Sequence, residues 1–181
     1  MSFSSKAVSS LEKCFLTSDI SKFTELKEEK IFKNQKYSFQ IVTHFAEGWQ
    51  IALKPVVEGD LADYITMREV VNIPSEMPTY YHCSDLPEVH TPGLYPDLLR
   101  PLKYRGILRL HPKQSRALWF DIDPKGKMVG KHTVKIKLML VEITSKGLNV
   151  TDEVFAEHEL KIEIKDAELP EQSLIFTQWF Y

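Results

Sequence analysis

Alternating apolar and polar residues mark several strands along this chain. The cleanest case is 150–165, where Leu160, Ile162 and Ile164 alternate with charged residues. A period of two places the apolar side chains on one face of a half-buried strand. Strands are also predicted at 37–45, 49–54, 64–71, 115–123 and 132–140. A weaker strand signal covers 23–32, and residues 1–22 fit a short helix or a first strand equally well.

Turn residues between these runs predict how the strands connect. Pro124, Lys125 and Gly126 join 115–123 to 132–140, and Glu47-Gly48 joins 37–45 to 49–54. We interpret both pairs as antiparallel hairpins. A turn with Gly147 precedes the strand at 150–165. A hairpin with one apolar face needs a second sheet to cover it. The predicted fold is therefore all-β, a two-layer antiparallel β-sandwich of immunoglobulin-like or jelly-roll-like type.

The pattern breaks between Pro74 and Tyr104, which contains six of the ten prolines. Proline removes donors that a sheet ladder requires. A connection of about thirty residues is usually functional or disordered. Its tyrosines and leucines favour burial, so we expect an ordered, non-repetitive crossover loop across one end of the sandwich.

Composition narrows the class of partner. The 181 residues suit one domain, and 43% hydrophobic with 27% charged residues is typical of a globular protein. The net charge of −2 predicts neither a nucleic-acid partner nor attachment to an anionic membrane. No apolar run approaches the roughly 18 residues of a membrane span. Without a visible secretory signal, and with two cysteines, the expected location is cytoplasmic.

Candidate chemistry is sparse. His82 and Cys83, followed by Asp85, Glu88 and His90, form the one cluster of potential ligands, but the spacing matches no zinc template. We predict no metal, no cofactor and no catalytic residue. Asp121 and Asp123 stand two residues apart on one strand, where they are better explained as solvated strand-end residues than as a catalytic pair.

The three tryptophans, Trp49, Trp119 and Trp179, could form platforms for sugar rings. Each lies in an apolar strand pattern, which favours packing in the core. Tyr95-Pro96-Asp97 differs from them because it lies in the predicted crossover, where Asp97 could brace a turn.

Four stretches resemble the glycoside hydrolase family 123-like proteins. Residues 92–102 are similar to the family's Y-P-D-x-L-x-P stretch, and residues 33–40 to R-N-E-x-x-S-F-Q, with Lys33 for Arg and Gln35 for Glu. Trp119, Pro124 and Gly130 resemble W-x-x-x-x-P…G-x-Y-x-G, with His132 in place of Tyr. Residues 177–180 look like T-x-W-F-H, which opens the family's catalytic barrel. The resemblance covers the chain in register from about residue 33.

This resemblance implies a non-catalytic amino-terminal accessory domain. Residues 1–172 would form the sandwich, and 173–181 would begin the linker into a carboxyl-terminal catalytic barrel absent from this chain. The parent would be a β-N-acetylhexosaminidase-type glycosidase, with its acidic pair on the barrel. The expected partner is that barrel, and the exposed carboxyl-terminal strand would otherwise favour self-association. The candidate binding or interface residues are Tyr95, Pro96, Asp97, Arg100, Trp179 and Phe180. The alternative is a free-standing carbohydrate-binding or protein-interaction module.

Overall fold

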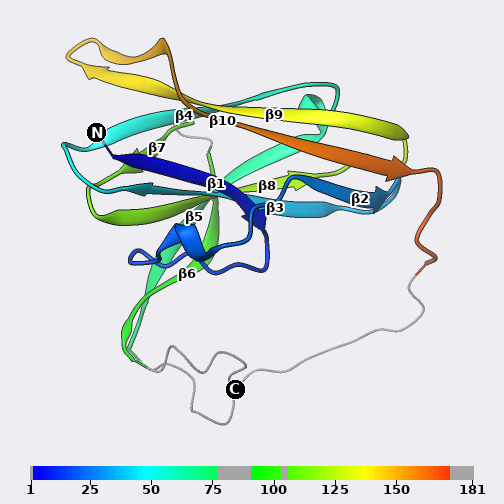
Figure 1. Ribbon diagram of the computed structural model, residues 1–181, viewed down its shortest axis with the longest axis horizontal. Coiled ribbons are helices and arrows are strands. Elements are labelled where there is room, and N and C mark those ends of the chain that lie inside the picture. The colour runs from blue at the N-terminus through cyan, green and yellow to red at the C-terminus, as the bar shows by residue number, and fades with distance from the viewer. Residues whose placement is uncertain (1, 77–90, 103–105, 172–181) are drawn as a thin grey trace.

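The computed structural model describes residues 2–76, 91–102 and 106–171. Its strands form two five-stranded sheets that pack face to face (Figure 1). The first sheet has the order β1-β3-β8-β5-β6, and the second has the order β2-β10-β9-β4-β7. The strands are β1 (Phe3–Ser9), β2 (Glu28–Phe32), β3 (Tyr37–Phe45), β4 (Ile51–Glu58), β5 (Ile65–Ser75), β6 (Gly93–Pro101), β7 (Leu108–Leu110), β8 (Gln114–Ile122), β9 (Gly130–Thr144) and β10 (Gly147–Lys165).

The two-layer β-sandwich prediction is confirmed. Two short 3-10 turns, η1 (Ile20–Lys22) and η2 (Ala62–Tyr64), accompany the strands. Every strand pairing within the described ranges is antiparallel except that of β2 with β10, which is parallel. Within those ranges no helix has both the length and the apolar character that crossing a bilayer requires.

The main core lies between the sheets. As the alternation predicted, Leu160, Ile162 and Ile164 of β10 are buried there. They face the first sheet, whose Phe39 and Phe120 stack with ring centroids 5.1 Å apart. Aromatic and branched aliphatic side chains from both inner faces exclude water, and this burial is the main source of stability.

Two of the predicted hairpins are wrong. β3 and β4 are consecutive in the chain but belong to different sheets, and so do β8 and β9. A turn can reverse the chain within one sheet or carry it over to the other sheet. Crossing to the other sheet lets the apolar faces of the two consecutive strands pack against each other. The hairpin formed by β9 and β10 does occur, and Gly147 at its turn has φ +132°, a conformation that favours glycine.

The Pro-rich region is not wholly a loop, contrary to prediction. β5 continues through Pro74, and β6 pairs antiparallel with it as the edge strand of the first sheet. An edge strand tolerates Pro96 and Pro101 because one side of its backbone has no neighbouring strand. Residues 77–90 and 103–105 lie outside the described ranges, and so does the predicted linker at 173–181 with Trp179 and Phe180.

The start of the chain forms a strand rather than a helix. After β1, residues 10–27, which we call the strap, cross the outer face of the first sheet before β2 begins in the second. The strap and the sheet share a smaller apolar cluster, formed by Val8, Cys14, Ile20, Val42, Val70 and Ala117. This second cluster explains why β3 is buried on both faces along much of its length.

Candidate functional site

A hollow of about 280 Å³ lies between the strap and the edge strand β6. We call it the strap hollow. Its lining is mostly apolar, with charged side chains among it: Ser10, Leu11, Glu12, Lys13, Cys14, Gln40, Val70, Pro96, Asp97, Leu99 and Trp119. These residues come from the strap, β3, β5, β6 and β8, so the hollow exists only when the strap is in place.

One buried amide holds the strap wall. Gln40 is 3% exposed, and its Nε2 donates to the carbonyl oxygens of Ser9, Ser10 and Glu12 at 3.3, 3.2 and 2.8 Å. Farther along, Ser115 Oγ donates to the Ser18 carbonyl at 2.7 Å. These side chains satisfy backbone groups that the irregular strap cannot pair with a sheet.

Trp119 is fixed beside the hollow by a polar network on the outer face of the first sheet. Its Nε1 donates to Asp121 Oδ1 at 2.7 Å, and Ser38 Oγ donates to the same oxygen, also at 2.7 Å. Arg68 forms an ion pair with the other oxygen of Asp121. Asp121 therefore orients an indole, so the prediction of a solvated strand-end residue is wrong for it. Strand register brings these residues together from β3, β5 and β8.

Four of the binding or interface residues predicted from the sequence, Tyr95, Pro96, Asp97 and Arg100, lie on β6. Pro96 and Asp97 line the strap hollow. Asp97 falls where the β5–β6 ladder shifts register, since Val71 pairs with Leu98 and Asn72 with Pro96. A bulge leaves one residue unpaired in the ladder and re-aims its side chain. Asp97 therefore occupies a strand bulge instead of the predicted turn.

Tyr95 and Arg100 have other partners. The ring of Tyr95 meets that of Phe15 in the strap edge to face, with centroids 6.0 Å apart, and its hydroxyl donates to the Thr91 carbonyl. Arg100 pairs with Glu69 of β5 at 2.6 Å. These contacts fasten β6 to the strap and to β5.

Apolar side chains near the strap hollow are open to solvent. Leu11 in the lining is 88% exposed, and Leu94, two residues before Pro96 on β6, is 48% exposed. Leu98 is 50% exposed but lies on the opposite face of β6, since it pairs with Val71 whereas Leu99 of the lining pairs with Val70. Cys14, which also lines the hollow, is buried, and burial raises the pKa of its thiol to about 12. A thiol that stays protonated is a poor nucleophile, so Cys14 acts as a small apolar residue here.

Trp49 lies elsewhere, and its predicted place in the core is wrong. It is 92% exposed in the connection that precedes β4. Because β4 begins at Ile51, the apolar pattern that included Trp49 started two residues too early.

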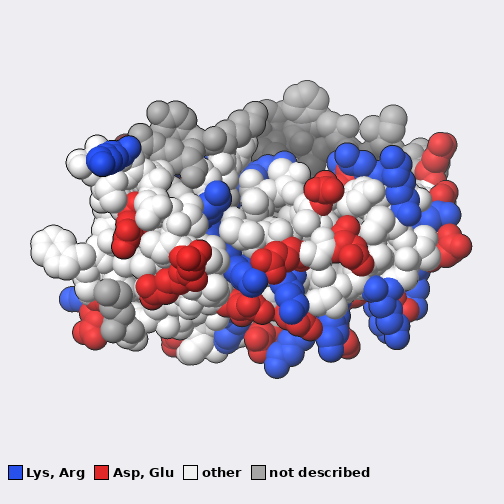
Figure 2. Space-filling view, turned by 90° about the horizontal axis from the view of Figure 1, so that it is seen from above, with Lys and Arg blue, Asp and Glu red and all other residues white. Residues whose placement is uncertain are grey.

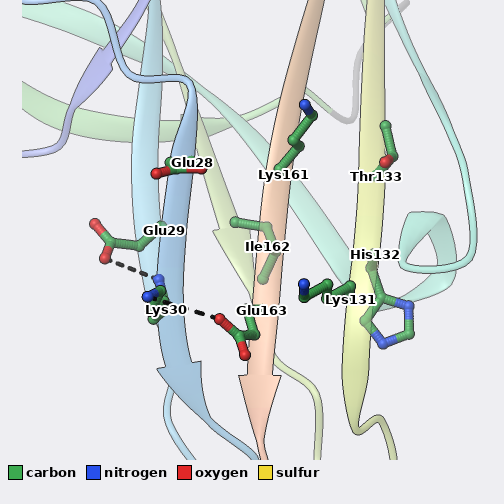
Figure 3. A pocket seen from close by; sticks show the side chains of 9 residues that line it. All are labelled: Glu28, Glu29, Lys30, Lys131, His132, Thr133, Lys161, Ile162 and Glu163. Carbon is green, nitrogen blue, oxygen red and sulfur yellow. Dashed lines mark hydrogen bonds and ion pairs between the residues drawn. The ribbon is translucent and has the colours of Figure 1, made fainter.

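A larger hollow, of about 620 Å³, lies over β2, β10 and β9 of the second sheet (Figure 3). Its charged lining consists of Glu28, Glu29, Glu163, Lys30, Lys131 and Lys161. The two signs balance, and Lys30 lies 3.9 Å from Glu163. Lysine and carboxylate side chains are also interspersed over the face seen in Figure 2. Exposed pairs of this kind are well screened by water, so this surface selects no ligand by charge.

His132 also lines the larger hollow, but its ring is turned away from the charged pairs (Figure 3). Its Nδ1 lies 3.6 Å from Asp60 Oδ2. No group of three or more potential metal ligands occurs in the part of the chain that the structure describes. The predicted candidates His82, Cys83 and His90 lie outside that part.

Comparison with solved structures identifies proteins with a similar fold. No protein-family model and no curated protein matches the sequence. A family 123 glycoside hydrolase from Clostridium perfringens matches in structure, with a TM-score of 0.65 and 11% identity, over 93% of this chain and 28% of that chain. The chain shares the fold of part of that enzyme. At this identity the likeness establishes the fold alone.

Other solved structures match less well. The amino-terminal domain of PorA matches with a TM-score of 0.38 and 7% identity, over 87% of this chain and 100% of that chain. AggA, the major subunit of an Escherichia coli adherence fimbria, matches with a TM-score of 0.38 and 7% identity, over 91% and 97% of the two chains.

Proposed function

We propose that this chain is a non-catalytic accessory domain that packs against the catalytic domain of a longer glycoside hydrolase-like protein. The observation that carries the proposal is the structural match, which covers 93% of this chain but 28% of the family 123 enzyme. The four sequence stretches that resemble this family point to the same relationship.

The proposed contact surface is the strap hollow with two exposed leucines, Leu11 of its lining and Leu94 of β6. A shallow apolar depression next to exposed leucines suits side chains of a neighbouring domain. Asp97, Glu12 and Lys13 would form a polar rim around this contact. This surface includes Pro96 and Asp97, two of the candidates predicted from the sequence.

The first test is the reading frame beyond Tyr181 and the activity of its products. The longer protein is expected to hydrolyse an aryl N-acetyl-β-hexosaminide, and the 181-residue chain is expected to hydrolyse none. A stop codon directly after Tyr181, or turnover by this chain alone, would overturn the proposal.

A second test addresses the contact surface. Leu11→Ser should lower the stability of the longer protein by about 1 kcal/mol more than that of the isolated chain, because only the longer protein buries Leu11, which is 88% exposed here. Ile143→Ser is the matched control, since Ile143 is 56% exposed on the β9–β10 hairpin, away from the strap hollow. Equal effects of Leu11→Ser in both proteins would exclude this surface.

One observation favours carbohydrate binding as a second candidate function. Trp119 is held rigidly by Asp121 beside a hollow that also presents the Asp97 carboxylate. An aromatic ring can pack on the apolar face of a sugar, and a carboxylate beside it can accept hydrogen bonds from the sugar hydroxyls. Titration with N-acetylgalactosamine should then shift the Trp119 indole resonance, and Asp97→Asn should weaken this response whereas Asp152→Asn should not. An unchanged indole resonance at tens of millimolar sugar, a concentration typical of weak single-sugar sites, would exclude this function.

A further inference from the structure

The segment that follows β10 does not leave the sandwich freely. Residues 166–169 lie against the turn between β2 and β3, at the end of the sandwich where β10 stops (Figure 1). The contacts come from two neighbouring residues of that turn, Lys33 and Asn34. Asn34 is 135 residues away from Leu169 in the sequence.

Asn34 binds the backbone of a single residue at two points. Its Nδ2 donates to the Leu169 carbonyl at 2.9 Å, and the Leu169 N–H donates to its Oδ1 at 2.8 Å. The side-chain amide thus pairs with Leu169 as a backbone residue of a neighbouring strand would. Both bonds are lost if the segment slips by one residue, so Asn34 sets its register.

Lys33 adds contacts on the preceding residues. Its backbone N–H donates to the Ala167 carbonyl at 3.2 Å. Its Nζ lies 3.1 Å from Asp166 Oδ1 and 3.3 Å from Glu168 Oε1. These two carboxylates raise the pKa of Lys33, as expected for an ammonium group with acidic neighbours. The positive charge of Lys33 in the turn therefore compensates the negative charges of Asp166 and Glu168 in the segment.

The turn itself is braced. The Gly126 N–H, from the connection between β8 and β9, donates to the Lys33 carbonyl at 2.9 Å. Gln35 closes the turn, because its Oε1 accepts from the Phe32 N–H at 3.1 Å and its own N–H donates to the Phe32 carbonyl at 3.0 Å. Because these hydrogen bonds fix the conformation of the turn, the turn can fix the direction of the segment that it binds.

We propose that the β2–β3 turn is a linker clamp, in which Asn34 and Lys33 hold residues 166–169 and set the direction in which the chain leaves the sandwich. If a catalytic domain follows, its orientation relative to the sandwich depends on this clamp. That consequence rests on the proposed function, whereas the holding of Leu169 by Asn34 does not.

The clamp is tested first on the 181-residue chain by amide hydrogen exchange. In Asn34→Ala, the Leu169 amide should exchange about tenfold faster or more, while the amides of Ile162 and Ile164 in the core of β10 keep their rates. Lys36→Ala is the matched control, because Lys36 belongs to the same turn but pairs with Asp123 at 3.3 Å. A Leu169 amide that exchanges equally fast in wild type and Asn34→Ala would overturn the clamp.

The second test uses the longer protein with spin labels, one at exposed Glu157 and one on the following domain. Asn34→Ala should broaden the distribution of distances between the labels, and Lys36→Ala should leave it unchanged. An unchanged distribution, with Leu169 protected in wild type and released in the variant, would refute the directing role and leave the proposed function standing. Absence of any following domain would overturn the proposed function and the directing role together, whereas the exchange result at Leu169 would stand.

Discussion

Replacing Gln40 by methionine tests whether the strap depends on one buried amide. The substitution keeps the length of the side chain but removes the group that donates to the carbonyls of Ser9, Ser10 and Glu12. Two N–H donors are shared among these three acceptors. At about 0.5–1.5 kcal/mol for each hydrogen bond lost, Gln40→Met should lower the free energy of unfolding by about 1–3 kcal/mol.

The loss should be visible at the strap as well as in the global stability. Urea unfolding, extrapolated linearly to water, gives the change in free energy. Hydrogen exchange should be faster in residues 10–14 than in wild type, and the fluorescence of Trp119 should shift to the red as the strap hollow opens. A Gln40→Met protein within about 0.3 kcal/mol of wild type, with unchanged exchange in the strap, would refute the reasoning.

Gln40→Glu adds a pH signature. A carboxylate facing carbonyl oxygens is disfavoured, so its pKa in the folded protein should lie above the unfolded value of about 4.3. The folded state then binds more protons than the unfolded state above that pH, and stability falls as the pH rises through the window between the two values. Wild type and Gln40→Met lack this group, so they serve as the controls.

Three other substitutions test separate parts of the structure. Asp121→Ala leaves the Arg68 guanidinium and two hydrogen-bond donors without their shared acceptor, and should lower the free energy of unfolding by about 2 kcal/mol in urea. Pro96→Val restores an N–H on the edge strand β6 and should increase self-association in sedimentation velocity. Burial lowers the pKa of His158, so the stability that this neutral imidazole contributes is present above its unfolded pKa of about 6.5 and is lost as the pH falls through the lower folded value. His158→Gln should therefore flatten the rise of thermal stability with pH just below the unfolded pKa of about 6.5.

Each of these three results has a contrary outcome. An Asp121→Ala protein as stable as wild type would show that the network does not hold Trp119. Pro92→Val alters a proline just before β6, and equal self-association of the two proline variants would exclude a specific effect of the edge. An unchanged pH slope in His158→Gln would assign the acid sensitivity to another group.

The candidate site was predictable only in part. The sequence singles out Pro96 and Asp97 because they lie in the Pro-rich stretch that resembles the family motif, and both line the strap hollow. Gln40 is one polar position in an alternating strand, and nothing local distinguishes it from a solvated glutamine. Its role follows from the strap passing over the outer face of β3, which the sequence does not indicate. Asn34 is similar, because its partner lies 135 residues away.

Local alternation was enough to predict the all-β class and the buried face of β10, because the period of side chains along a strand is set by the backbone itself. It could not decide which strands are neighbours. Turns with glycine and proline reverse the chain in the same way whether the next strand joins the same sheet or crosses to the other, as β3–β4 and β8–β9 do. That choice depends on how much apolar surface the two sheets bury together, a quantity that belongs to the whole fold and to no single segment. The strap hollow and the linker clamp arise from the same long-range pairing, so only the tertiary structure decided them.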